Sequence, residues 1–273
     1  MKRFFCILLA LGLLLAGCAG NAPAPTDPPE ADPTEPQMKM VWVRTSQTTQ
    51  TQGLTNRTEL IYDANDRVTE AAVFVNEAET ARYTVECDEN GNFIRWTSHE
   101  EVQEYAYDAA GNLLRYETFK NGDLATGYTF TYDAAGNRIS QELRIQRLGV
   151  AQRTDYLYDD QGRNIRQEVY LDGKLTRTAD CVCDDQGRIL TMEGRAADGT
   201  LELITEYAYE GGVETRVSRT PEGEVIQTIL IIRDSWDNII RTESYSGTGA
   251  LLVTEITAWK LIAVPADCPR ASI

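Results

Sequence analysis

A tyrosine–aspartate pair recurs along most of this chain at a nearly fixed spacing. Intact copies stand at Tyr62-Asp63, Tyr107-Asp108, Tyr132-Asp133 and Tyr158-Asp159. With degenerate copies that begin at Cys87, Cys183, Tyr209 and Arg233, the repeat starts fall at positions 62, 87, 107, 132, 158, 183, 209 and 233. A period near 25 residues indicates one supersecondary unit, repeated and stabilised by its neighbours.

Each repeat reads as two strands and two turns. After Tyr132, the residues Asp133 to Asn137 form an Asp-x-x-Gly turn in which the glycine supplies a positive φ. The same turn predicts positive φ at Gly111, Gly136, Gly162 and Gly187. A second turn follows in each repeat, as at Asn121-Gly122 and Asp172-Gly173. We therefore expect an all-β fold of antiparallel hairpins over residues 38–260, forming one extended, twisted or partly curled sheet.

Alternation predicts which residues face the core. The Tyr position and the position two residues earlier are apolar in most repeats, as at Phe130 and Tyr132. After the turn, an aliphatic residue recurs seven places beyond the Tyr position, and we expect these to be core residues too: Ile94, Leu114, Ile139, Ile165, Leu190 and Ile240.

A charged row follows on the opposite parity. Its members are Arg115 and Glu117, Arg166 and Glu168, Arg241 and Glu243, with Glu142 and Glu193. A row of carboxylates is compatible with a cation site or a glycosidase pair. Because the row follows the repeat symmetry, we interpret it as a solvated face with cross-strand Arg–Glu pairing. The turn aspartates are interpreted as structural, since each turn offers one carboxylate and calcium needs several.

The N-terminus carries an export signal. Lys2 and Arg3 precede a short apolar stretch, and Leu15-Ala16-Gly17-Cys18 looks like the lipobox of bacterial lipoproteins. That resemblance implies cleavage before Cys18 and lipidation of its thiol, with an ordinary signal peptide as the alternative. Residues 1–18 are then the signal and lipobox, and the chain is expected on the extracytoplasmic face of a bacterial cell membrane.

A proline-rich acidic segment, residues 19–37, is typical of an extended tether. The whole chain has 26 basic and 42 acidic residues, and losing Lys2 and Arg3 leaves 24 − 42 = −18. Such a surface excludes nucleic acid as a partner, because phosphate binding requires an excess of Lys and Arg. Residues 261–273 are assigned as a C-terminal tail.

Four cysteines lie beyond the lipobox, at Cys87, Cys181, Cys183 and Cys268. The first three occupy slots that hold aromatic or apolar residues in sister repeats, which favours small core residues. A disulfide to Cys268 stays open, because the sequence does not select a pairing. The sole histidine, His99, has no second ligand nearby in sequence, so we expect no metal and no cofactor.

The spacing Tyr-Asp-x-x-Gly-(Asn/Arg), then an aliphatic residue, a Gly turn and an aromatic-x-Tyr-Asp, resembles the YD repeats of the rearrangement-hotspot (RHS) family. The resemblance covers roughly residues 55–245, with the best copies beginning at Tyr107, Tyr132 and Tyr158. It implies long β-sheets and an association with carbohydrate binding and surface contacts. Because this chain has few repeats, we expect an open sheet whose degenerate repeats from Tyr209 onward cap the array.

Three functions are compatible with these features: a surface module that binds a glycan or a protein, a structural spacer, and a cell-envelope hydrolase. The hydrolase is disfavoured, because no Gly-x-Ser-x-Gly or Cys–His arrangement supplies a nucleophile with its base. We expect no enzymatic activity. Candidate ligand-binding residues recur twelve places beyond the Tyr position on the charged face: Phe119, Arg144, Tyr170, Arg195 and Tyr245. The alternative is that they form cross-strand pairs, or that a bulge turns some of them inward.

The lipobox yields the first testable prediction. Radiolabelled palmitate should enter the wild-type chain and should not enter Cys18→Ala, because the thiol of Cys18 is the proposed acceptor. Equal labelling of both proteins would exclude lipidation at this residue.

Overall fold

A computed structural model describes residues 38–265, and their side chains over residues 40–262. This part of the chain is almost entirely strand, with one short 3-10 turn, η1 (Gln146–Leu148), and the following strands: β1 (Met38–Thr51), β2 (Leu54–Tyr62), β3 (Val68–Val75), β4 (Ala78–Cys87), β5 (Phe93–Thr97), β6 (Glu101–Tyr107), β7 (Leu113–Lys120), β8 (Asp123–Tyr132), β9 (Arg138–Ile145), β10 (Val150–Tyr158), β11 (Asn164–Leu171), β12 (Lys174–Cys183), β13 (Ile189–Ala196), β14 (Leu201–Glu210), β15 (Val213–Arg219), β16 (Val225–Arg233), β17 (Ile239–Ser246) and β18 (Leu251–Pro265). The predicted signal, Cys18, the tether and Cys268 lie outside the described residues.

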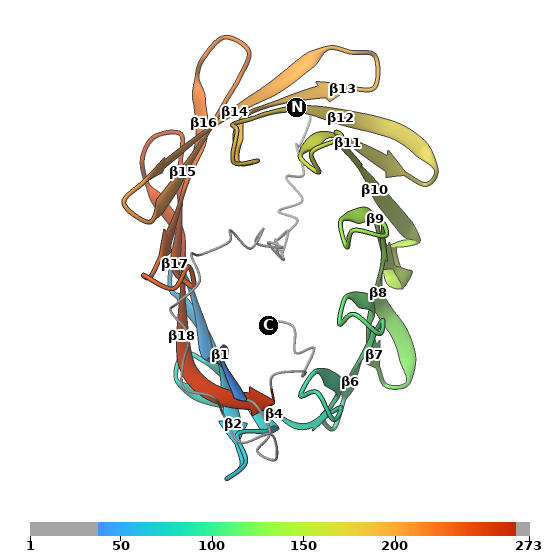
Figure 1. Cartoon of the computed structure of the whole chain (residues 1–273), viewed down its shortest axis with the longest axis vertical. Helices are drawn as coiled ribbons and strands as arrows, with labels where there is room; N and C mark the ends of the chain where they lie inside the picture. The colour runs from blue at the N-terminus through green and yellow to red at the C-terminus, as the bar shows by residue number, and fades with distance from the viewer. Residues whose placement is uncertain (1–37, 266–273) are drawn as a thin grey trace, which may run out of the picture. The chain divides into compact units, whose positions relative to one another are not determined.

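The strands form one closed, 18-stranded antiparallel barrel (Figure 1). Each strand pairs with its neighbours in sequence, and β1 pairs with both β2 and β18. The β1–β18 ladder runs from Met38↔Pro265 to Thr51↔Val253. The expected open or partly curled sheet is therefore wrong, because the two ends of the array satisfy each other's backbone groups. The degenerate repeats from Tyr209 onward continue the ladder and do not cap it.

The Asp-x-x-Gly turns are built as the sequence predicts. Asp133 Oδ1 accepts hydrogen bonds from the backbone N–H groups of Ala135 at 2.9 Å and Asn137 at 2.8 Å. The Asn137 side chain donates to Asp133 Oδ2 at 2.9 Å, and this bond holds the pKa of Asp133 below its ordinary value. Gly136 has φ 87°, and the other three predicted glycines are also positive, at 87°, 75° and 80°.

A β-bulge follows most of these turns and reverses one prediction. In the hairpin of β8 and β9, Thr131 pairs with Ser140 but Tyr132 pairs with Arg138, so Ile139 is an extra residue. Its side chain lies on the outer face of the barrel and is 40% exposed. The predicted core positions share this geometry and are 36–41% exposed: Ile94, Leu114, Ile139, Ile165, Leu190 and Ile240. Alternation fails at the bulge, because Ile139 and Ser140 both face outward, and this is why the prediction was wrong.

The side chain of the motif tyrosine forms a hydrogen bond to the preceding strand of its hairpin. Tyr132 Oη donates to the carbonyl oxygen of Leu113, 19 residues earlier, at 2.9 Å. The same bond recurs from Tyr62, Tyr158, Tyr209 and the indole N–H of Trp259. Cys87 and Cys183 place a thiol in this slot, on the carbonyl oxygens of Val68 and Asn164. A net contribution of about 1 kcal/mol for each such bond helps to explain why the position recurs.

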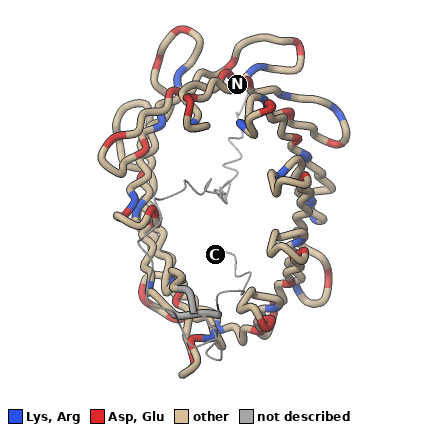
Figure 2. The backbone as a smooth tube through the Cα atoms, in the orientation of Figure 1, with Lys and Arg blue, Asp and Glu red and all other residues tan. Residues whose placement is uncertain are grey.

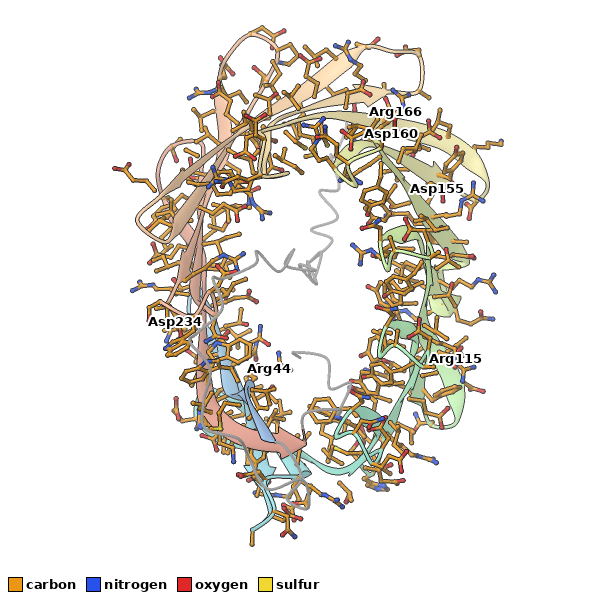
Figure 3. All side chains as sticks on the ribbon, in the orientation of Figure 1. Arg44, Arg115, Asp155, Asp160, Arg166 and Asp234 are labelled. Carbon is orange, nitrogen blue, oxygen red and sulfur yellow. The ribbon has the colours of Figure 1, made fainter. Side chains whose placement is uncertain are left out.

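The inner wall is the face on which Arg44 lies, and the outer wall carries Arg115 and Arg166 (Figure 3). The inner wall is packed most densely over β2–β5, where a cluster contains Leu60, Val68, Ala71, Val85, Phe93 and Trp96. Elsewhere most inward side chains are half-buried. On this inner wall, four of the predicted core residues are buried: Leu60, Val85, Phe130 and Cys181.

The charged row lies on the outer wall, and its pairs form along single strands. Arg115 lies 3.3 Å from Glu117 and Arg166 lies 3.1 Å from Glu168. Arg166 also reaches across to Asp180 on β12, at 2.6 Å. Basic and acidic residues are interspersed around the ring in Figure 2. Exposed pairs of this kind contribute about 0–1 kcal/mol each, so the row serves mainly to solvate the wall.

The turn geometry predicts the effect of a substitution. Gly136→Val should lower the free energy of unfolding by about 1–2 kcal/mol, because a β-branched residue is strained at positive φ. Gly136→Asn should lose less, since Asn tolerates this conformation. Chemical denaturation of the three proteins measures the difference, and an unchanged Gly136→Val midpoint would contradict the turn assignment.

Closure of the barrel predicts a cross-link. Thr49 on β1 and Glu255 on β18 are directly opposed, and opposed side chains in antiparallel strands have Cβ atoms about 5 Å apart. The double variant Thr49→Cys/Glu255→Cys should form an intramolecular link with a short bifunctional thiol reagent. Mass spectrometry of the digest identifies the linked peptides, and each single variant is the control. An open sheet would give no link.

Candidate functional site

The predicted ligand-binding residues lie on the outer wall, one on each of several odd-numbered strands. They stand near the strand ends that lead into the second turn of each repeat: Phe119 on β7, Arg144 on β9, Tyr170 on β11, Arg195 on β13 and Tyr245 on β17. Successive odd strands lie two strands apart, which is about 10 Å. The barrel thus arranges these residues as a spaced row, which we name the outer row.

Most members of the outer row bind a glutamate two places earlier on the same strand. Tyr170 donates to Glu168 at 2.7 Å and Tyr245 donates to Glu243 at 2.6 Å. Arg144 donates to Glu142 at 2.7 Å, and Arg195 pairs with Glu193 in the same way. The hydrogen bond to Glu168 raises the pKa of Tyr170 and lowers that of Glu168. The spacing Glu-x-(Tyr/Arg) was a sequence signal for this pairing.

The structure places one of the five candidates, Tyr170, in a surface depression. A shallow depression of about 130 Å³ is lined by Glu142, Ala151, Gln152, Arg153, Tyr170 and Gly173. The Arg153 guanidinium lies 4.4 Å from the centre of the Tyr170 ring. Arg144 does not line the depression, but it donates a hydrogen bond to Glu142, which does. Phe119, Arg195 and Tyr245 do not line it either.

The inner wall holds aromatic residues that the sequence reading did not group. Tyr105 stacks on Tyr116 with ring centres 4.9 Å apart, and Tyr116 on Tyr128 at 5.9 Å. Tyr128 lies beside Phe130 at 6.2 Å. Tyr116, nine places beyond a motif tyrosine, pairs directly with Tyr105 across β6 and β7. Predicting this row from the sequence would have required knowing where the bulge lies, because the bulge sets which residues pair across β6 and β7.

Ionisable groups are also buried in this wall. Glu214, only 8% exposed, accepts a hydrogen bond from Arg216 Nε at 2.6 Å. Burial raises the pKa of the Cys181 thiol to about 11, so the thiol stays protonated at neutral pH. Cys181 and Cys183 are free thiols. Over the described residues, no group of three or more His, Cys, Asp or Glu side chains is placed to hold a metal ion.

No helix within residues 38–265 is long and apolar enough to cross a membrane.

Comparison with known proteins gives low similarity. No protein-family model and no curated protein matches the chain. Among solved structures, TcdB2-TccC3-TEV is 10% identical with a TM-score of 0.31, over 74% of this chain and 17% of that one. A porin-like protein from Bacteroides uniformis ATCC 8492 is 9% identical with a TM-score of 0.30, over 80% and 96%. One from Bacteroides vulgatus ATCC 8482 is 10% identical with a TM-score of 0.29, over 80% and 98%. This chain therefore spans under a fifth of TcdB2-TccC3-TEV, and these similarities define neither a family nor an activity.

Proposed function

We propose that this chain is a short lipoprotein of the YD-repeat type, anchored through Cys18 on the extracytoplasmic face, that binds a glycan without chemically altering it. The observation that carries the proposal is the outer depression beside Tyr170. An aromatic ring, a guanidinium and a carboxylate converge there on a shallow, open surface.

These groups suit a sugar. A pyranose presents an apolar C–H face and a rim of hydroxyl groups, which match an aromatic surface and planar charged groups respectively. Arg153 lies over the Tyr170 ring and also pairs with Asp155 at 3.1 Å, so its orientation is held before any ligand arrives. Ala151 and Gly173 have small side chains or none, which leaves room beside the ring.

The chemistry of the outer wall supports a water-facing location. Charged residues stand within the strands, including Arg115 on β7 and Arg166 on β11, and point away from the ring in Figure 3. An arginine or lysine facing the centre of a lipid bilayer costs about 2–4 kcal/mol. A wall with one such charge on many strands is therefore suited to water and to soluble ligands.

The test is a glycan array probed with the full-length protein purified in detergent. The double variant Arg144→Ala/Tyr170→Ala should lose at least tenfold in affinity, with its far-ultraviolet spectrum and melting temperature nearly unchanged, because these side chains are on the surface.

The matched control is Arg195→Ala/Tyr245→Ala. It removes the same two side-chain types, each likewise bonded to a glutamate two places earlier, but away from the depression, and it should bind as the wild type does. Absence of any glycan binding by the wild type would refute the proposed function. Equal loss in both double variants would move the site from the depression to the whole outer row.

A further inference from the structure

A patch of the inner wall on β8–β11 has the opposite charge character from the rest of the protein. It contains Phe130, Arg138, Gln141, Tyr156, Asn164 and Gln167, and none of them is acidic. Register places them together: Phe130 pairs with Gln141 across β8 and β9, and Tyr156 pairs with Gln167 across β10 and β11. The outer wall of the same strands carries Glu142, Asp155 and Glu168. In a chain with a net charge of −16, this segregation marks the patch.

Arg138 is the centre of the patch. Its guanidinium lies 4.9 Å from the centre of the Tyr156 ring and 5.8 Å from that of Phe130. It donates a long hydrogen bond of 3.4 Å to Tyr156 Oη. No Asp or Glu within the described residues forms an ion pair with it, whereas Arg163 and Arg188 are each paired with a turn aspartate.

The geometry leaves the donors of Arg138 available. Stacking on a ring uses the face of the guanidinium, while its N–H groups point outward in the plane. Around it stand the amides of Gln141, Gln167 and Asn164, with Gln167 Nε2 at 3.5 Å from Asn164 Oδ1. Apart from Phe130, which is 6% exposed, the patch residues are half-buried and keep contact with solvent.

The geometry points to a second binding site on the inner wall, for an acidic glycan whose sugar carries a carboxylate. Arg138 would receive the carboxylate on its fork of N–H donors, the geometry in which Arg binds carboxylates most strongly. The three amides would bond the ring hydroxyls. The absence of acidic side chains from the patch removes the repulsion that an anionic sugar meets on the outer wall. This site does not depend on the outer depression.

The experiment uses the full-length protein in detergent and isothermal titration with tetragalacturonate, compared with its fully methyl-esterified form. The two probes share a backbone and differ in charge. Wild type should bind the acid at least tenfold more tightly than the ester. Arg138→Gln should lose at least tenfold in affinity for the acid and should no longer discriminate between the probes.

Two controls separate the site from its alternatives. Arg147→Gln removes an equal charge from the exposed η1 turn, at a guanidinium that also has no carboxylate partner within the described chain, and should bind as wild type does. Arg138→Lys keeps the charge without the fork and should retain part of the preference for the acid, which separates lost binding from lost folding. Arg144→Ala/Tyr170→Ala should bind tetragalacturonate as wild type does, even if it loses affinity for the glycan that the outer depression binds.

Three outcomes would overturn the inner site: Arg138→Gln binding the acid as wild type does, wild type failing to distinguish acid from ester, or wild type binding neither probe. Loss of tetragalacturonate binding in Arg144→Ala/Tyr170→Ala, with Arg138→Gln unaffected, would overturn it as well and assign the ligand to the outer depression.

Discussion

The backbone ladder between β1 and β18 closes the sheet into a barrel. An antiparallel sheet made of repeats ends in two edges whose N–H and C=O groups lack partners, and such edges promote aggregation. Here the first and last strands pair over nearly their whole length. Closure removes both edges and gives the sheet an inside and an outside. Every later distinction between the two walls follows from it.

The bulges and the tyrosine hydrogen bonds give that closed sheet its two faces. A bulge bends a strand and increases its twist, and one follows most Asp-x-x-Gly turns. Beside several of these bulges, the motif tyrosine or its replacement binds a carbonyl oxygen across the hairpin, as Tyr132 does with Leu113. Together they turn aliphatic residues such as Ile139 outward and keep the aromatic residues inside. An aliphatic side chain that alternation assigns to the core therefore faces water.

The two walls also differ in charge, and this difference organises the proposals on function. The outer wall pairs many of its acids with arginines, and Tyr170 and Arg153 line a depression there. The inner wall over β8–β11 has rings and amides around Arg138, which lacks an acidic partner in the described chain. A neutral sugar suits the first surface and an acidic sugar suits the second. Both surfaces use side chains that neighbouring strands hold in place before a ligand binds.

Features that depend on near neighbours in the chain could be predicted from the sequence. The repeat period, the hairpin turns, the positive φ of Gly136 and the outward Arg–Glu row are set by residues a few positions apart. The tertiary structure alone decided closure, register and the contacts of the sites. Thr49 meets Glu255 across 206 positions, and Arg138 meets Tyr156 across 18. Such contacts depend on accumulated twist and on each bulge, and a one-residue shift in register moves a side chain to the other wall.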